Sequence, residues 1–183
     1  MSMELSPIAQ ALNLALSPFA ARVRTEQSAD IDFAAELYAL TRAAELAHVP
    51  WPDDAKRQFC RQQFEAQHTH YATNYAAPQF LIIERDVQQL GDQIDSRIGR
   101  VYAEQTAHEV SLMEITLLHE ARNRGIGTAI SAALVQYAHT CGVAAGLHVE
   151  PLNAARRLYE RQGFSEVEAR GFYLYMRCEP PEL

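Results

Sequence analysis

The chain has 183 residues, a formal net charge of −7 and apolar residues at 48% of its positions. This length is enough for one domain with a full hydrophobic core, and the composition is that of a soluble globular protein. General nucleic-acid binding needs a basic face, so the acidic balance argues against that function. A cationic substrate is compatible with the charge, but net charge identifies no partner by itself.

Cysteine usage and apolar runs bear on metal content and location. The three cysteines are odd in number and far apart: Cys60, Cys141 and Cys178. Their spacing predicts neither a disulfide framework nor a zinc cluster, so we expect no metal and a reducing cytoplasm. Residues 5–21 are apolar, but they lack a basic leader and Pro7 and Pro18 interrupt them, which argues against an export signal. No apolar run in the sequence reaches the length of a membrane span, so no membrane association is expected.

The first 18 residues are predicted to be an N-terminal extension (1–18) to a single domain over 19–183. A helix is expected over 8–16, followed by the first strand of the domain over 19–25. The apolar side chains of the extension need cover, so they pack either on the domain or on a second subunit. A homodimer could form through this segment or through the last strands of the chain, and the sequence does not decide between a monomer and a dimer.

Hydrophobic periodicity predicts helices and strands along the rest of the chain. Helices are expected over 30–48, 55–75, 125–140 and 153–162, and strands over 79–85, 97–105, 109–118, 146–149, 165–168 and 172–176. Pro50 and Pro52 separate the first two helices, and a polar hairpin loop is expected over 86–96. The order β-α-α-β-β-β-α-β-α-β-β predicts an α/β domain with a mixed sheet and helices on both faces.

The stretch 117–128 combines the end of an apolar strand, a polar turn and the start of a helix. The turn contains two arginines and two glycines: Arg122, Arg124, Gly125 and Gly127. Glycine lets a ligand approach the backbone, and the unpaired N–H groups of a helix N-terminus suit a phosphate. The stretch is therefore either a pyrophosphate cradle or a plain strand-to-helix turn with solvated arginines. It matches neither commoner phosphate loop: the Walker pattern is missing, and Ile130 stands where the third glycine of Gly-x-Gly-x-x-Gly belongs.

The helix expected over 55–75 carries an unusual aromatic stripe. Its members follow helical spacing: Cys60, Phe64, His68, Tyr71 and Tyr75. One interpretation is an amphipathic helix whose rings are packed with their polar ends in water. The other is a wall of a cleft that binds an acceptor substrate. His68 and His70 are two residues apart and point in different directions on a helix, so they do not form a metal-binding pair.

A second motif occupies 153–164. Together with the turn it closely resembles the GNAT superfamily of N-acetyltransferases. Arg122-x-x-Gly125-x-Gly127 matches that family's Arg/Gln-x-x-Gly-x-Gly/Ala acetyl-CoA loop, and Asn153, Leu158-Tyr159 and Gly163-Phe164 match its second motif. The resemblance covers about residues 19–177 and implies a mixed, mostly antiparallel central sheet.

The resemblance implies acetyl-CoA as the co-substrate. The backbone of Leu117 and Leu118 would pair with the pantetheine arm, and N–H groups from Asn123 through Thr128 would hold the pyrophosphate. Asn153 would bond to the pantetheine or to nearby backbone, and Tyr159 would stand near the sulfur. The implied cofactor-binding set is Leu117, Leu118, Arg122, Asn123, Arg124, Gly125, Ile126, Gly127, Thr128, Asn153 and Tyr159. His119 replaces a proline that many relatives have, which affects the stiffness of the loop.

Two residues are predicted to be catalytic, Tyr159 and Glu114. A phenol has a pKa near 10, so Tyr159 can protonate the leaving thiolate at neutral pH; the alternative is a half-buried packing residue. Glu114 lies in an apolar strand, where a carboxylate is either a general base or the partner of an arginine. His108 is an alternative base, and His148 on the following strand is expected to be structural.

The predicted function is acetyl transfer from acetyl-CoA to a primary amine of a small molecule or protein by direct attack. No Cys-His arrangement suggests a covalent enzyme intermediate. The acceptor is expected to contact Trp51, Phe64, His68 and Tyr71. The alternatives are a non-catalytic CoA-binding regulatory or interaction module, which would not need Tyr159, and a nucleotide-binding protein.

Overall fold

A seven-stranded sheet in the order β1-β2-β3-β4-β5-β7-β6 forms the centre of the computed structural model, which describes residues 5–85 and 95–181. The strands are β1 (Ala21–Thr25), β2 (Pro78–Arg85), β3 (Arg97–Gln105), β4 (Glu109–Leu117), β5 (Ala144–Val149), β6 (Ser165–Arg170) and β7 (Tyr173–Cys178). Among these strands only β4 and β5 pair in parallel. The mixed, mostly antiparallel sheet is therefore confirmed; most of the hairpin loop expected over 86–96 lies outside the described residues.

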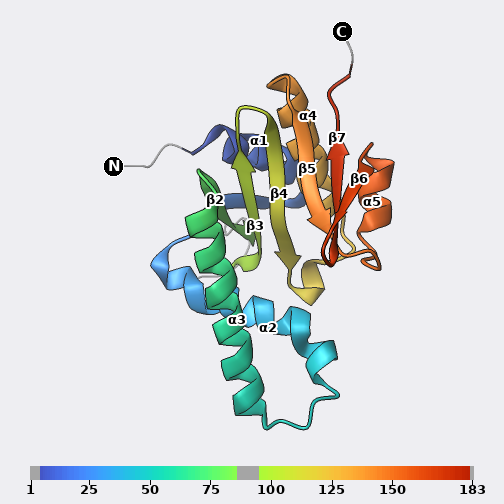
Figure 1. Cartoon of the computed structure of the whole chain (residues 1–183). Coiled ribbons are helices and arrows are strands. Elements are labelled where there is room, and N and C mark those ends of the chain that lie inside the picture. The colour runs from blue at the N-terminus through green and yellow to red at the C-terminus, as the bar shows by residue number, and fades with distance from the viewer. Residues whose placement is uncertain (1–4, 86–94, 182–183) are drawn as a thin grey trace.

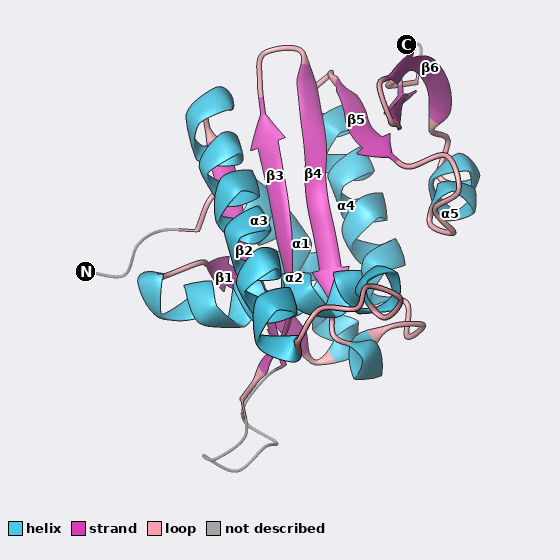
Figure 2. Ribbon diagram, turned by 60° about the horizontal axis from the view of Figure 1, so that its bottom comes forward, coloured by secondary structure: helices cyan, strands magenta, loops and turns pink. Residues whose placement is uncertain are grey.

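Five α-helices lie on the two faces of the sheet within the described part of the chain. They are α1 (Pro7–Leu16), α2 (Ile31–Leu46), α3 (Asp53–Asn74), α4 (Ile126–Thr140) and α5 (Arg156–Arg161). Figures 1 and 2 show α2 and α3 on one face and α1 and α4 on the other. The main core lies on the α1 and α4 side, and a smaller one lies between α2 and α3.

The N-terminal segment packs on the domain, the first of the two outcomes considered above. Ser6 begins α1 by accepting a hydrogen bond from the N–H of Ala9, and Pro7 suits the first helical turn. The buried face of α1 contains Ile8, Ala9, Leu12 and Leu16, all within the main core. Asn13 then accepts a hydrogen bond from the N–H of Val23 over 2.6 Å, which fixes α1 against β1.

Several element boundaries differ from those expected. The first strand begins at Ala21 because residues 17–19 form a 3₁₀ turn, after which Ala20 has a φ of 48°. The second long helix begins at Asp53, with Pro52 directly before it. The last helix begins at Arg156 rather than at residue 153. The backbone before it turns around the side chain of Asn153, which accepts a hydrogen bond from the N–H of Ala155.

The feature that matters most for function is the separation of β4 from β5. Their pairing runs from Glu109–Ala144 to Leu112–Leu147, whereas β4 continues to Leu117. Met113 lies in a β-bulge of β4. Tyr102 pairs with Glu114 and the next residue, Ala103, pairs with Leu112, so Met113 has no partner on β3. A bulge bends its strand and increases the local twist. The two strands therefore diverge toward their C-terminal ends (Figures 1 and 2).

Candidate active site

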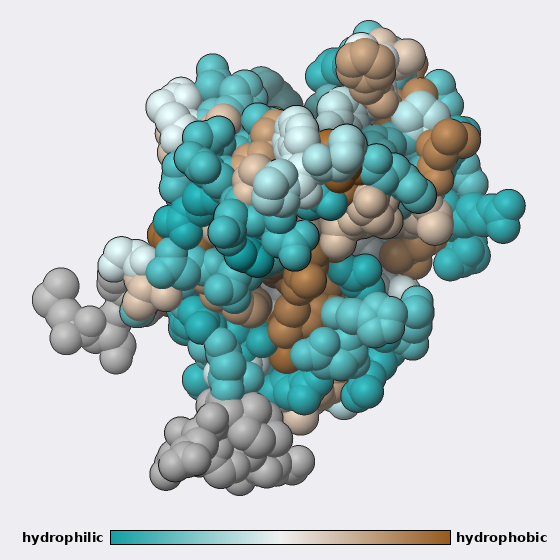
Figure 3. Space-filling model, turned by 90° about the horizontal axis from the view of Figure 1, so that it is seen from below, coloured by the Kyte–Doolittle hydropathy of each residue, from teal (hydrophilic) through white to brown (hydrophobic). Residues whose placement is uncertain are grey.

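The open edge of β4 is the first part of the candidate site. The N–H of Leu118 donates to the carbonyl oxygen of Ile98 on β3 over 2.8 Å. Backbone groups alternate sides along a strand, so the N–H groups of Ile115 and Leu117 point the other way, into the gap beside β5. Seen from the end toward which β4 runs, an apolar band lies exposed between hydrophilic regions (Figure 3). The free backbone edge can pair with an extended amide chain, as open sheet edges pair with peptides.

The turn after β4 leads into the N-terminus of α4. Asn123 has a φ of 58°, and Gly125, the residue before α4, has a φ of 88°. A Cβ atom on Gly125 would lie 3.1 Å from Cε1 of Phe19, so both conformation and space favour glycine. The N–H of Ala129 bonds to the carbonyl oxygen of Gly125, which leaves the first-turn N–H groups without partners inside the helix. These donors and the partial positive charge of the helix end suit a phosphate.

The side chains around the N-terminus of α4 leave room for a ligand to reach the backbone N–H groups. The first-turn N–H groups belong to Ile126, Gly127 and Thr128. Gly127 has room, because a Cβ atom there would lie 3.8 Å from Cδ1 of Ile115, an ordinary contact. Arg122 donates from Nε to the carbonyl oxygen of Leu117 over 2.8 Å, and Arg124 is exposed. The structure thus gathers the expected cofactor-binding residues of 117–128 at the C-terminal end of β4.

The helix α5 and the turn before it hold the residues of the second motif. Tyr159 is buried, and its ring packs edge-on against Phe164 with 5.8 Å between centroids. Burial raises the pKa of Tyr159, so the phenol is protonated at neutral pH. The Oδ1 atom of Asn153 accepts a hydrogen bond from the N–H of Ala155 over 2.9 Å. Asn153 therefore shapes the backbone before α5.

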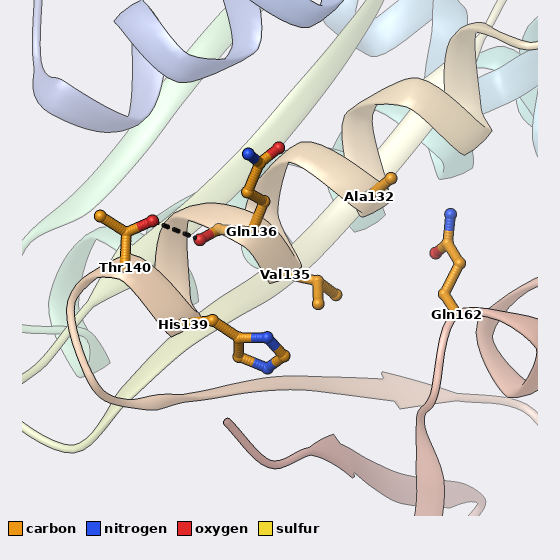
Figure 4. A pocket seen from close by; sticks show the side chains of 6 residues that line it. All are labelled: Ala132, Val135, Gln136, His139, Thr140 and Gln162. Carbon is orange, nitrogen blue, oxygen red and sulfur yellow. Dashed lines mark hydrogen bonds between the residues drawn. The ribbon is translucent and has the colours of Figure 1, made fainter. Parts of the chain in front are cut away.

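A hollow of about 560 Å³ lies along the C-terminal half of α4 (Figure 4). It is lined by Ala132, Val135, Gln136, His139, Thr140 and Gln162. Gln162 also donates to the carbonyl oxygen of Thr128 over 3.0 Å, which ties the end of α5 to the first turn of α4. The far end of the hollow is about 20 Å from the start of α4 at 1.5 Å per residue, so it is distinct from the helix N-terminus.

Glu114 forms a buried ion pair with Arg100 of β3. Arg100 is 0% exposed and donates from Nε to Oε1 of Glu114 over 3.0 Å, and its Nη2 bonds to the same oxygen. Thr116 adds a third hydrogen bond to Oε1, over 3.0 Å. Burial acts to lower the pKa of Arg100, but Glu114 and Tyr102 outweigh it and the pKa is raised. Glu114 is therefore the partner of an arginine, and its Oε2 is buried with no hydrogen-bond partner among the described residues; its role as a base stays a prediction.

A polar network that sequence analysis did not identify surrounds Arg100. Its guanidinium lies 5.0 Å from the ring centroids of both Phe64 and Tyr102. The hydroxyl of Tyr102 donates to Glu26 over 2.6 Å, and the other carboxylate oxygen of Glu26 lies 2.8 Å from Nε2 of His68. The network joins the segment after β1 to β3 and α3. No sequence motif marks it, because its members are far apart in the chain.

Some members of the aromatic stripe of α3 are packed as core, and others lie beside polar groups of the sheet. Phe64 is 1% exposed and packs between α2 and α3, so it offers no surface to a ligand. His68 stacks on Phe80 with 4.5 Å between centroids and is bound to Glu26. Tyr71 stands edge-on to Tyr102 at 6.2 Å, and burial followed by Glu114 raises its pKa. Tyr71 therefore lies near the charged part of β4.

Trp51 lies apart from the stripe. Its ring packs edge-on against Phe59 with 5.5 Å between centroids, and 45% of the residue is exposed. Trp51 precedes α3, and the rise of a helix puts it about 25 Å from His68. The structure does not bring Trp51 to the other residues expected to contact the acceptor.

The α3-side face of β5 and β7 carries a second polar cluster. Figure 1 shows α3 in front of β2 and β3, with β5 and β7 to the side of it. The hydroxyl of Tyr175 donates to Glu109, whose other carboxylate oxygen accepts from Ser111 over 2.6 Å. A Cβ atom on Gly146 would collide with the carboxylate of Glu109, so that carboxylate lies directly over β5. Burial and the bond to Glu109 raise the pKa of Tyr175 to about 12.

The alternative base His108 lies in the turn between β3 and β4, where its N–H donates to Oγ1 of Thr106 over 3.2 Å. At about 3.3 Å per residue, it is roughly 20 Å along the strand from Glu114. Within residues 5–85 and 95–181, no group of three or more His, Cys, Asp or Glu side chains could hold a metal ion. In the same ranges no helix is long and apolar enough to cross a membrane.

Comparison with known proteins agrees with this geometry. A model of the acetyltransferase (GNAT) family matches residues 35–164. The PaiA N-acetyltransferase of Thermoplasma acidophilum, solved with coenzyme A, has a TM-score of 0.62 and 16% identity over 87% of this chain and 98% of that one. Spermidine N-acetyltransferase of Vibrio cholerae, solved with CoA and spermine, has a TM-score of 0.55 and 17% identity over 87% of this chain and 94% of that one. No curated protein matched the chain.

The two solved structures show a shared fold at low sequence identity. The family match is independent of them and spans well over half of the chain, from within α2 to the end of the second motif. It includes β4, the turn, α4 and α5. This chain belongs to the GNAT acetyltransferase family.

Proposed function

We propose that this chain transfers the acetyl group of acetyl-CoA to a primary amine by direct attack. The observation that carries the proposal is the gap between β4 and β5 that ends at the N-terminus of α4. The strand edge offers backbone groups for the pantetheine arm, and the helix end offers N–H groups for the pyrophosphate. Coenzyme A, the part of acetyl-CoA that remains after acetyl transfer, is bound in these two solved neighbours and supports the same assignment.

The backbone of the strand and turn makes most of the donor contacts in this proposal. The N–H of Leu118 is already bonded to β3, so pairing with the pantetheine falls to Ile115 and Leu117. The N–H groups from Asn123 through Thr128 hold the pyrophosphate, and Arg122 and Arg124 add positive charge. Such charge-assisted bonds are about twice as strong as neutral ones.

The same geometry supplies the chemistry. Attack on a thioester creates an oxyanion, and an N–H that points into the gap, that of Ile115 or Leu117, is placed to donate to it. Tyr159 then protonates the leaving thiolate, which requires the protonated phenol that its burial favours. These residues orient the reactants and move one proton, and no covalent enzyme intermediate is needed.

The acceptor is proposed to be an amine with positive charge. Burial is the main cause of the raised pKa of Tyr75, and the charges of Glu104 and Glu109 add to it. For Tyr71 the main cause of the raised pKa is again burial, and Glu114 adds to it. The three carboxylates therefore lie near these two tyrosines at the C-terminal end of α3. Carboxylates attract an ammonium group, and aromatic faces stabilise cations. A small-molecule amine and a lysine or terminal amine of a protein both satisfy this chemistry. The spermidine N-acetyltransferase neighbour makes polyamines the first candidates.

A thiol-release assay over a panel of amines tests the proposal. The panel contains a polyamine, an amino sugar, free amino acids, and peptides with a lysine or a free N-terminus, each with acetyl-CoA at constant concentration. We expect CoA release that depends on at least one amine. Calorimetry with acetyl-CoA and ATP separates the alternatives. Tight acetyl-CoA binding without amine-dependent release indicates a non-catalytic CoA-binding module, and binding of ATP alone indicates a nucleotide-binding protein.

A further inference from the structure

His148 occupies a position next to the point where β4 and β5 separate. It follows Leu147, the last residue of β5 that pairs with β4. Leu147 and Val149 face the core under α4, so the alternation of a strand directs His148 to the opposite face. In parallel register its neighbour across the opening is the bulged residue Met113, directly before Glu114. His148 thus stands beside the closed end of the gap, on the α3 side of the sheet.

The imidazole of His148 is held in one orientation by β6 and β7. It stacks on the ring of Tyr175 with 5.0 Å between centroids and 29° between planes. Nη1 of Arg170 lies 3.5 Å from Nε2 of His148, and Arg170 also bonds to Glu168 over 2.6 Å. At this length the contact is weaker than an ordinary hydrogen bond and does not assign the tautomer of the ring.

The charged groups around His148 come from three strands. Burial and then Arg170 lower its pKa, whereas Glu109 on β4 and Glu168 on β6 act in the opposite direction. Tyr175 on β7 is protonated at neutral pH and donates its hydroxyl hydrogen to Glu109. The net shift is downward, so the ring is neutral at pH 7 and can accept a proton.

We propose that His148 is the general base that removes a proton from the ammonium group of the acceptor. The inference rests on the proposed acetyltransferase function. The neutral imidazole of His148 takes one ammonium proton and passes it to solvent, which frees the lone pair of the amine nitrogen. The N–C bond then forms and the C–S bond breaks with its electron pair on sulfur. The attacking nitrogen then loses its second proton to solvent, Tyr159 protonates the thiolate, and the resulting tyrosinate regains a proton from solvent, so protons and charge balance.

The other two candidate bases have poorer geometry for this step. Oε1 of Glu114 accepts hydrogen bonds from Arg100 and Thr116, Oε2 is buried with no hydrogen-bond partner among the described residues, and the ion pair with Arg100 holds the carboxylate beside β3. His108 lies at the opposite end of β4 from the gap. His148 is the histidine of β5, is exposed, and directly follows the last residue of β5 that pairs with β4.

The test compares the pH dependence of kcat/KM for the wild-type chain, His148→Gln and His108→Gln. The substrate is the panel amine that the wild-type chain acetylates fastest. We expect His148→Gln to lower kcat/KM by about 10²-fold or more near pH 7 and to remove the acid limb. The deficit should shrink as the pH passes the pKa of the amine, because a free amine needs no base. His108→Gln should match the wild type.

Two results would overturn the assignment. A deficit of His148→Gln that stays constant with pH would indicate a structural role, and a profile equal to that of His108→Gln would exclude any role. Arg170→Gln provides a second readout: it removes a positive neighbour, so the acid limb should move to higher pH, and an unmoved limb counts against His148. No turnover of any amine by the wild type would instead contradict the proposed function itself.

Discussion

The guanidinium of Arg122 donates a hydrogen bond from Nε to the carbonyl oxygen of Leu117 over 2.8 Å. The bond joins the turn before α4 to the open edge of β4, the two surfaces that the donor substrate is proposed to bridge. Arg122 therefore fixes the relative position of the strand edge and the helix N-terminus. The family motif supplies an arginine at this position, and the contact gives a physical reason for it.

Removing Arg122 should weaken acetyl-CoA binding without unfolding the protein. A charge-assisted hydrogen bond from the guanidinium to a phosphate oxygen would contribute about 1.5–3 kcal/mol to binding, so Arg122→Ala should raise the Kd about tenfold or more. Arg124→Ala removes a similar charge from an exposed side chain, and it should raise the Kd less. Calorimetric titration with acetyl-CoA measures both values. Equal effects would mean that the arginines contribute only through overall charge.

Gly127 provides a matched pair of variants at the helix end. A Cβ atom fits there, so Gly127→Ala should keep acetyl-CoA affinity and stabilise the helix by up to about 1 kcal/mol. Gly127→Asp should also fold, because a carboxylate suits the first turn of a helix. The same carboxylate would repel a pyrophosphate, so the Kd for acetyl-CoA should rise strongly. Undiminished affinity of Gly127→Asp would place the pyrophosphate elsewhere.

Gly125 should be far less tolerant than Gly142, although both have positive φ. Their φ values are 88° and 70°, but a Cβ atom on Gly125 meets Phe19, whereas one on Gly142 has nothing within 4 Å. Left-handed conformation costs a residue with a Cβ atom about 1–2 kcal/mol. Gly142→Ala should show about that loss and Gly125→Ala a larger one in urea unfolding. Equal losses of unfolding free energy would show that the ring of Phe19 moves aside without cost.

Glu114→Gln should destabilise the fold because it leaves the buried guanidinium of Arg100 without a charged partner. Breaking a buried ion pair costs about 3–5 kcal/mol, and the half-buried position of Glu114 puts this case near the lower value. Urea unfolding measures the loss, and the pH profile of kcat/KM should keep its acid limb. A stable Glu114→Gln protein without an acid limb would restore Glu114 as the base.

Tyr159→Phe should keep the affinity for acetyl-CoA and lower kcat by about 10²-fold or more, the usual contribution of a general acid. In the wild type the protonated phenol is the active form. Burial raises its pKa, so activity should persist to a higher pH than an exposed tyrosine, with a pKa of about 10, would allow. Single-turnover kinetics would show the effect in the chemical step. An unchanged kcat would assign Tyr159 to packing alone.

The local parts of the site were predictable from the sequence, and the parts built from distant residues were not. The turn at 122–128 and the motif at 153–164 are each continuous, and each carries its signal in residue type and spacing. The ion pair of Arg100 with Glu114 depends on β3–β4 register, which a bulge at Met113 shifts by one residue. Hydrophobic periodicity does not encode that shift.

The polar clusters show the same limit. Glu26 meets Tyr102 only through the order of the strands and the course of α3. The imidazole of His148 contacts Arg170 and Tyr175, which lie on two later strands. Sequence alone therefore favoured a structural role for this histidine. The apolar N-terminal segment had two expected ways to cover its side chains, and the structure shows α1 packed on α4.

The most direct test of the central claim is mass spectrometry of the amine after incubation with isotopically labelled acetyl-CoA and the purified chain. The account predicts a labelled acetyl group on the nitrogen of at least one amine, with CoA released in equal amount, and much slower formation of both products by Tyr159→Phe and Gly127→Asp. Acetyl-CoA binding without a labelled product from any amine of the panel would contradict it.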